Sequence, residues 1–222
     1  SPLLIAPLLL PLLGASLTLV LWRWPRLQAG VGIGAAALLL PAAAALLRDV
    51  QQAGTIAGQV GGWQAPVGIT LAADGLSALM LLLTAVIGTA VAVYGAGEAP
   101  LRRGRHMFFP LLHVLLLGVS GAFLTGDLFN LYVWFEVLLV GSFGLLILGG
   151  RRDDLEGAVK ALVLNLLGSL LFLLAAGAVY GLAGTLNLAD LHGRLAEVYA
   201  VRPGAVTVVA LLLAVAFSLK AA

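Results

Sequence analysis

Residues 121–148, GAFLTGDLFNLYVWFEVLLVGSFGLLIL, decide the fold of this chain because they form a nearly uninterrupted apolar run with one acidic residue, Glu136, at its centre. If a helix begins near Leu128, Glu136 lies about 12 Å along it, deep in the hydrocarbon of a bilayer. A charged carboxylate at that depth costs roughly 2.5–3.5 kcal/mol on insertion scales. We therefore interpret Glu136 as a protonatable residue that faces other helices or trapped water. The alternative is a carboxyl group that is protonated or paired for packing.

The composition excludes a soluble globular protein, because 62% of the residues are hydrophobic and only 10% are charged. The net charge of +2 is too small to indicate a nucleic-acid partner, and the absence of cysteine excludes disulfides, iron–sulfur clusters and thiolate metal sites. The three histidines have no metal-ligand spacing, so we expect no cofactor and no metal. Apolar runs long enough to span a bilayer predict an all-α membrane protein with about seven transmembrane helices, near residues 2–22, 27–47, 72–95, 107–125, 128–148, 157–183 and 204–222.

The distribution of arginines predicts the orientation of these helices. Seven arginines flank or fill the first, third and fifth connections, whereas three lie in the alternate connections. Because positive charge collects on the cytoplasmic side, we expect the N-terminus outside the cytoplasm of a multi-pass cell-membrane protein. The seven are Arg23, Arg26, Arg102, Arg103, Arg105, Arg151 and Arg152, and the three are Arg48, Arg194 and Arg202. The first apolar segment lacks a basic start and a cleavage site, so we interpret it as a retained helix.

Two outer connections are long enough to have structure of their own. Residues 48–71 contain GQVGGWQAPVGITLA, whose glycines, proline and alternating apolar positions predict a short extended hairpin. Residues 187–199, NLADLHGRLAEVY, predict a short amphipathic helix with Asn187 as its N-cap, on which His192 is an interfacial residue. Asp74 is expected to cap the third span.

Three further ionisable residues are candidates for proton transfer. Lys220 lies more than about four turns into the last span, where burial disfavours its charged form and a nearby carboxylate favours it. Its alternative is a lysine that snorkels to the cytoplasmic end of the helix. Lys160 could join the relay or merely pair with Glu156 at i,i+4. His113 could pass protons to a buried carboxylate or simply pack through a hydrogen bond.

Small and polar residues of the sixth span indicate how it packs. Gly177 and Gly181 form a small-xxx-small pair that permits close approach of another helix. Asn165 and Ser169 share a face one turn apart, which predicts a polar strip for interhelical hydrogen bonds or bound water.

Several of these stretches are similar to a known family. TGDLFNLYVWFEVLLVGSFGLLIL resembles the fifth-helix motif of the antiporter-like, proton-translocating subunits of respiratory complex I and of Mrp-type Na⁺/H⁺ antiporters. KALVLNLLGSLLFLLAAGAVYGLAGTLNLADL resembles the following helix and loop of the Mrp D subunit. ADGLSALMLLL resembles the family's third-helix entry, and FSLKAA the start of its seventh-helix lysine motif.

The resemblance implies a proton-translocation site of Glu136 and Lys220 on helices five and seven, with an ionisable residue on helix six matched by Lys160. Mrp D subunits often have histidine at that place. The resemblance also implies a protein built from two inverted repeats. We expect residues 1–106 to supply three N-terminal helices and residues 107–222 an incomplete first repeat, so that the chain is a fragment or half of a split subunit without transport of its own.

The implied function is that of a proton-translocating subunit of a multisubunit monovalent cation (Na⁺)/H⁺ antiporter, with other membrane subunits as partners. One alternative is a non-redox membrane subunit of an NADH–quinone oxidoreductase or a membrane hydrogenase. The other is a non-conducting scaffold whose buried charges fix the helix register. The chain carries no catalytic chemistry by itself in any of these interpretations.

Overall fold

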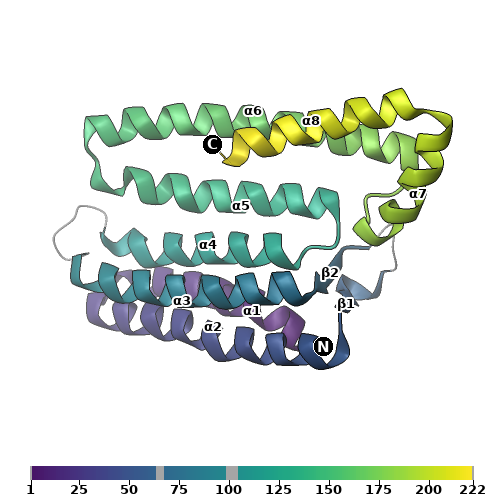
Figure 1. Cartoon of the computed structure of the whole chain (residues 1–222). Coiled ribbons are helices and arrows are strands. Elements are labelled where there is room, and N and C mark those ends of the chain that lie inside the picture. The colour runs from purple at the N-terminus through teal and green to yellow at the C-terminus, as the bar shows by residue number, and fades with distance from the viewer. Residues whose placement is uncertain (1, 64–67, 99–104, 222) are drawn as a thin grey trace.

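The apolar runs form a bundle of antiparallel helices in a computed structural model that describes residues 2–63, 68–98 and 105–221. Seven helices of this described part are long and apolar enough to cross a membrane, as the sequence predicted. Figure 1 shows them stacked side by side, with a hairpin and a short helix at one end. They are α1 (Pro2–Val20), α2 (Pro25–Ala53), α3 (Gly75–Glu98), α4 (Arg105–Leu124), α5 (Leu128–Leu146), α6 (Arg152–Ala183) and α8 (Pro203–Ala221).

Two predicted boundaries are wrong because the helical pattern continues into polar residues. The second span was expected to end at residue 47, but α2 continues to Ala53 through a stretch without glycine or proline. The sixth span was expected to begin at residue 157, but α6 begins at Arg152 with Asp153 and Asp154 in its first turn. Carboxylates in that position stabilise the positive end of the helix dipole.

The predicted hairpin is confirmed as two short antiparallel strands, β1 (Ile56–Gln59) and β2 (Thr70–Ala73), with Ile56 opposite Ala73 and Gln59 opposite Thr70. A 3₁₀ turn, η2 (Val60–Gly62), follows β1, and Gly61 and Gly62 have φ values of 68° and 77° that favour glycine. Residues 64–67 of the predicted hairpin lie outside the described residues, as do Arg102 and Arg103 of the predicted basic connection.

Two expected N-caps are confirmed by their hydrogen bonds. The Ser77 amide donates to Asp74 Oδ1 at 2.8 Å, and this bond lowers the pKa of Asp74. The amides of Ala189 and Asp190 donate to Asn187 Oδ1 at the start of α7 (Leu188–Val201), the predicted amphipathic helix.

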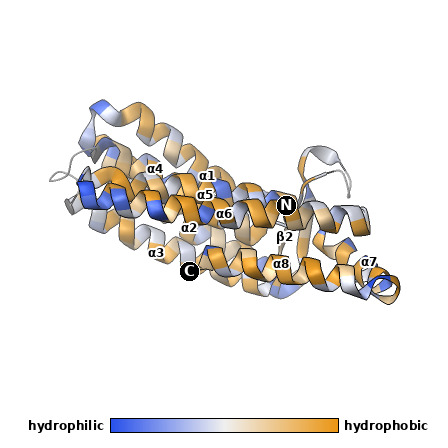
Figure 2. Ribbon diagram, turned by 90° about the horizontal axis from the view of Figure 1, so that it is seen from above, coloured by the Kyte–Doolittle hydropathy of each residue, from blue (hydrophilic) through white to orange (hydrophobic). Residues whose placement is uncertain are grey.

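Two ends of the bundle differ in chemistry. The arginine end contains the α1–α2 and α5–α6 connections with Arg23, Arg26, Arg151 and Arg152. The hairpin end, opposite to it, contains β1, β2 and α7. Figure 2 shows apolar colour along the helices and hydrophilic colour in the first turns of α6.

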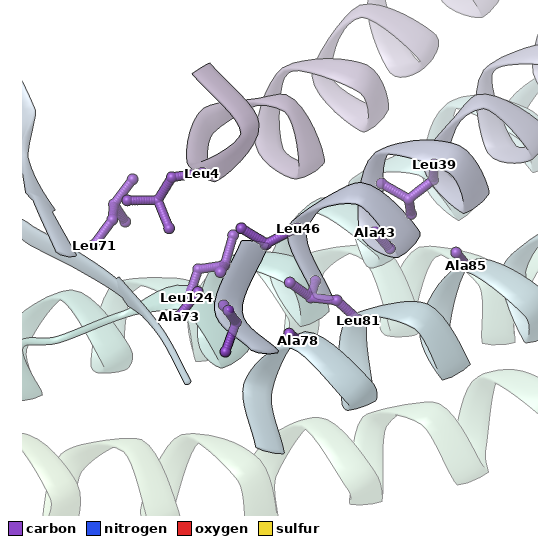
Figure 3. Close-up of a cluster of buried hydrophobic side chains, with 11 residues drawn as sticks. Leu4, Leu39, Ala43, Leu46, Leu71, Ala73, Ala78, Leu81, Ala85 and Leu124 are labelled. Carbon is purple, nitrogen blue, oxygen red and sulfur yellow. The ribbon is translucent and has the colours of Figure 1, made fainter. Parts of the chain in front are cut away.

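The core consists of separate clusters that hold the helices in two groups. One cluster joins α1, α2, β2, α3 and α4, and Figure 3 shows its leucines and alanines meeting between these elements. A second joins α2, α3 and α4 around Phe109. A third joins α5, α6, α7 and α8 around Phe172. Large apolar side chains on the outside of α1, α3, α6 and α8 remain exposed, as expected for surfaces that face lipid or other subunits.

Candidate functional site

Glu136, Ser169 and Lys220 come together from three helices. Glu136 is half-buried on α5, and the hydroxyl of buried Ser169 on α6 donates a hydrogen bond to its Oε1. The ammonium group of Lys220 on α8 donates to Ser169 Oγ at 2.8 Å. No nitrogen–oxygen contact within 4.0 Å joins Glu136 and Lys220 directly, although both are described. The serine hydroxyl therefore bridges the acid and the amine.

The length of α6 explains why Lys220 reaches the middle of the bundle. The 32 residues of α6 span about 48 Å, which exceeds the roughly 30 Å of a hydrocarbon core. The chain then passes through α7 before α8 returns, so the last turn of α8 lies beside the middle of α6 (Figure 1). The sequence left open whether Lys220 snorkels to the end of its helix. In the structure, its amino group instead lies against Ser169.

A glycine lets α8 approach α6 at this point. A Cβ atom at Gly168 would lie 3.3 Å from Leu219 Cβ and 3.4 Å from Lys220 Cγ, which is tighter than most real contacts. Because glycine has no side chain, the lysine can lie directly over the helix and reach the neighbouring serine. Gly168 is therefore part of the positioning of Lys220.

Three phenylalanines pack beside the polar residues. Phe135, Phe172 and Phe217 meet edge to face, with ring centroids 5.4–6.2 Å apart. Phe172 follows Ser169 by one turn in α6, and Phe217 precedes Lys220 by one turn in α8, so both lie on the hairpin-end side. The Lys220 ammonium is also 4.9 Å from the centroid of the Phe135 ring, a distance at which the ring attracts a cation.

Close backbone contacts fix the helix that carries Glu136. A Cβ atom at Gly118 of α4 would lie 2.7 Å from the Leu138 amide nitrogen of α5. Reciprocally, a Cβ atom at Gly141 of α5 would lie 2.7 Å from the Leu115 amide nitrogen of α4. The two helices therefore touch main chain to main chain at two points in the turns that follow Glu136.

Hydrogen bonds at the hairpin end hold the start of the same helix. Asp127 caps α5 by accepting from the Asn130 amide at 2.9 Å. The Leu128 amide donates to the Leu186 carbonyl at 3.0 Å, and the Leu188 amide donates to the Gly126 carbonyl at 2.9 Å. Asn187 also donates through Nδ2 to Thr70 Oγ1 at 2.8 Å, which connects α7 to β2.

Lys160 has a different partner. Its ammonium group donates to Glu156 Oε1 at 2.7 Å on the same helix, and the two side chains are 72% and 65% exposed. This is the i,i+4 pair that the sequence left open, and the structure does not bring Lys160 into contact with Glu136, Ser169 or Lys220.

His113 lies in the core of the other helix group. Its ring is fully buried, and Nε2 is 3.0 Å from the Gly32 carbonyl of α2, so that this nitrogen is the donor. The other face meets α1, where a Cβ atom at Gly14 would lie 2.7 Å from Nδ1. Among the described residues, His113 and Glu136 form no hydrogen bond with each other. The histidine instead joins α4 to α1 and α2.

The interhelical hydrogen bonds expected for the strip of Asn165 and Ser169 are confirmed for Ser169, but its ionisable partners were missed by reasoning from sequence. The Asn165 amide instead donates to the Ala161 carbonyl of its own helix at 3.1 Å. No helix of the described residues packs on Gly177 and Gly181, because both are exposed and a Cβ atom at either would meet nothing within 4 Å. The sequence holds one signal for Ser169, because it directly follows Gly168, a residue small enough for another helix to approach. Its partners depend on how three helices pack.

Comparison with known proteins agrees with this architecture. Residues 125–222 match the "NADH:quinone oxidoreductase/Mrp antiporter, TM" family. The chain is 39% identical over 216 residues to the D subunit of the Na(+)/H(+) antiporter of Bacillus subtilis, a match that covers 97% of this chain and 43% of that protein. The chain therefore spans less than half the length of this relative.

Two solved structures have the same arrangement of helices. A chain of the membrane-bound sulfane sulfur reductase, an archaeal respiratory membrane complex, matches with a TM-score of 0.88 and 29% identity, over 96% of this chain and 43% of that one. A chain of the Mrp complex from Dietzia sp. DQ12-45-1b matches with a TM-score of 0.86 and 30% identity, over 97% of this chain and 40% of that one.

Proposed function

The chain belongs to the family of membrane subunits shared by NADH:quinone oxidoreductases and Mrp antiporters, and from this premise we propose that it forms part of the proton-translocating subunit of a multisubunit Na⁺/H⁺ antiporter. The name of the Bacillus subtilis relative and the Mrp complex support the antiporter class. The partners would be other membrane subunits, and the transported ions would be protons and Na⁺.

The observation that carries this proposal is the hydrogen-bonded connection of Glu136 to Lys220 through Ser169. Two opposite charges in a poorly solvated site stabilise each other, and separating them or neutralising one makes the other expensive to keep charged. A change at one residue is therefore expected to bind or release a proton at the other. This coupling is what a proton relay requires.

The relay assigned here consists of Glu136 and Lys220. Lys160 and His113 have other hydrogen-bond partners, so the proposed relay leaves them out. Their part in proton transfer is a prediction from the sequence alone. The orientation is likewise proposed from the arginines: the arginine end faces the cytoplasm, and the hairpin end faces outside in the cell membrane.

Membership of a respiratory complex is the second candidate function. The favouring observation is the archaeal sulfane sulfur reductase, whose chain superposes with a TM-score of 0.88. The same relay would then be driven by redox chemistry in other subunits. Genes for small antiporter subunits beside this one would favour the first candidate, and genes for cluster-binding subunits the second.

The test uses a Glu136→Gln variant in the complete antiporter, assayed in everted vesicles with a pH-sensitive dye. The amide has the shape of the carboxyl group but cannot take up a proton, so the complex should assemble and cation/proton exchange should be abolished. Glu136→Asp should retain part of the activity. Glu156→Gln is the matched control, because that carboxylate lies on the exposed side of α6. Full exchange in Glu136→Gln would contradict the proposal.

A further inference from the structure

We propose that the Ser169 hydroxyl carries the proton between Lys220 and Glu136, an inference that rests on the function proposed above. Ser169 is only 3% exposed, donates to Glu136 Oε1 and accepts from Lys220 Nζ at 2.8 Å. Since the acid and the amine do not touch each other, the hydroxyl provides the hydrogen-bonded route between them.

The geometry of Ser169 differs from that of other serines in these helices. Ser142 donates to the Leu139 carbonyl of its own helix at 3.0 Å, and Ser218 donates to the Ala214 carbonyl of its own helix at 2.8 Å. Such back-bonding is the usual way for a helical serine to satisfy its hydroxyl. Ser169 instead contacts ionisable side chains on two other helices, an arrangement that helix packing alone does not require.

A hydroxyl can serve both neighbours because it has one donor hydrogen and two acceptor lone pairs. One N–H bond of the Lys220 ammonium breaks as its proton bonds to Ser169 Oγ. At the same time the original Oγ–H bond breaks, and that proton bonds to Glu136 Oε1. The products are a neutral amine, a neutral carboxylic acid and a regenerated hydroxyl, so protons and charge balance.

The two transfers are concerted, since a free serine alkoxide would be an isolated charge in a buried site. After transfer, both hydrogen bonds point the other way: the glutamic acid donates to Oγ, and Oγ donates to the lysine nitrogen. The heavy atoms keep their positions. The serine can therefore connect the charged pair and the neutral pair without a change of rotamer.

The experiment compares three variants in the complete antiporter complex in everted vesicles. Ser169→Ala removes the hydroxyl and should lower Na⁺-driven proton exchange at least about tenfold, because positioned proton transfer contributes about 10²–10⁴-fold to rates. Ser169→Thr retains a hydroxyl and should restore much of the exchange with the pH profile of the parent. Ser142→Ala is the matched control, since its hydroxyl bonds only within its own helix, and should exchange at the parent rate.

The outcomes separate this inference from the proposed function. Parent-level exchange in Ser169→Ala, with Glu136→Gln inactive, would overturn the role of Ser169 and leave the Glu136–Lys220 relay intact. Parent-level exchange in Glu136→Gln would overturn both. Equal losses in Ser169→Ala and Ser169→Thr, or failure of Ser169→Ala to assemble, would make Ser169 a structural bridge and refute its role as the proton carrier.

Discussion

Replacing Gly141 with alanine should destabilise the bundle by forcing α4 away from α5. The new Cβ atom would lie 2.7 Å from the Leu115 amide nitrogen and 2.9 Å from Leu115 Cα. Restoring an ordinary contact of 3.4 Å requires the helices to separate by about 0.7 Å, because backbone atoms cannot rotate away as a side chain can. Overpacking of this kind costs about 1–3 kcal/mol.

The intrinsic preference of helices for alanine over glycine, about 1 kcal/mol, acts in the opposite direction. A matched control removes this contribution: Gly177→Ala on α6 makes the same substitution where nothing lies within 4 Å of the new atom. The difference between the two variants in the free energy of unfolding should therefore be about 1–3 kcal/mol. Denaturant unfolding in detergent, followed by circular dichroism, measures it.

Exchange activity provides a second measurement on the same pair of variants. The displaced α5 carries Glu136, so Gly141→Ala should also slow cation/proton exchange, whereas Gly177→Ala should not. Equal stability of the two variants would refute the reasoning, since it would mean that α4 and α5 do not meet backbone to backbone at Gly141.

Three further predictions concern residues away from this contact. Lys160→Gln should leave exchange close to that of the parent, because an exposed pair with Glu156 contributes at most about 1 kcal/mol; a loss as deep as that of Glu136→Gln would return Lys160 to the relay. Asp74→Ala should destabilise the protein by about 0.5–2 kcal/mol through the lost N-cap. Because the Ser77 amide lowers the pKa of Asp74, this difference should be full at neutral pH and should disappear as the pH falls through the lowered pKa, as unfolding at several pH values would show. In this cysteine-free chain, Arg151→Cys should react with an impermeant maleimide only from the cytoplasmic side and His192→Cys only from outside; labelling from the opposite sides would reverse the orientation.

The helices were predictable from sequence because each is an apolar run long enough to span a bilayer. Helix α7 was predictable for a different reason, because an amphipathic pattern follows the capping residue Asn187. Glu136 and Lys220 could be singled out because ionisable residues are rare in such runs. All of these signals are local, so a single chain suffices to detect them.

The contacts between helices were not predictable in this way. Ser169 looks like Ser142 or Ser218 in sequence, and its partners depend on how α5 and α8 pack on α6. Likewise, the spacing of Gly177 and Gly181 suggested a close contact, whereas Gly118 and Gly141 are glycines that meet the main chain of a neighbouring helix. The distinction depends on which face of each helix is covered, and that is a property of the assembled bundle.

The two charged ends of the proposed relay are mounted differently, and this asymmetry has a mechanical consequence. Glu136 lies on a helix that touches its neighbour through main-chain atoms, so there is no soft side chain between them to absorb a displacement. Lys220 is attached to α8 through four flexible methylene groups, and α8 approaches Gly168 through side-chain atoms of Leu219 and Lys220. We therefore expect α5 with its acid to be stationary, and α8 with its amine to move, during a transport cycle. Spin labels or fluorophores on α8 would then report motion that identical probes on α5 do not.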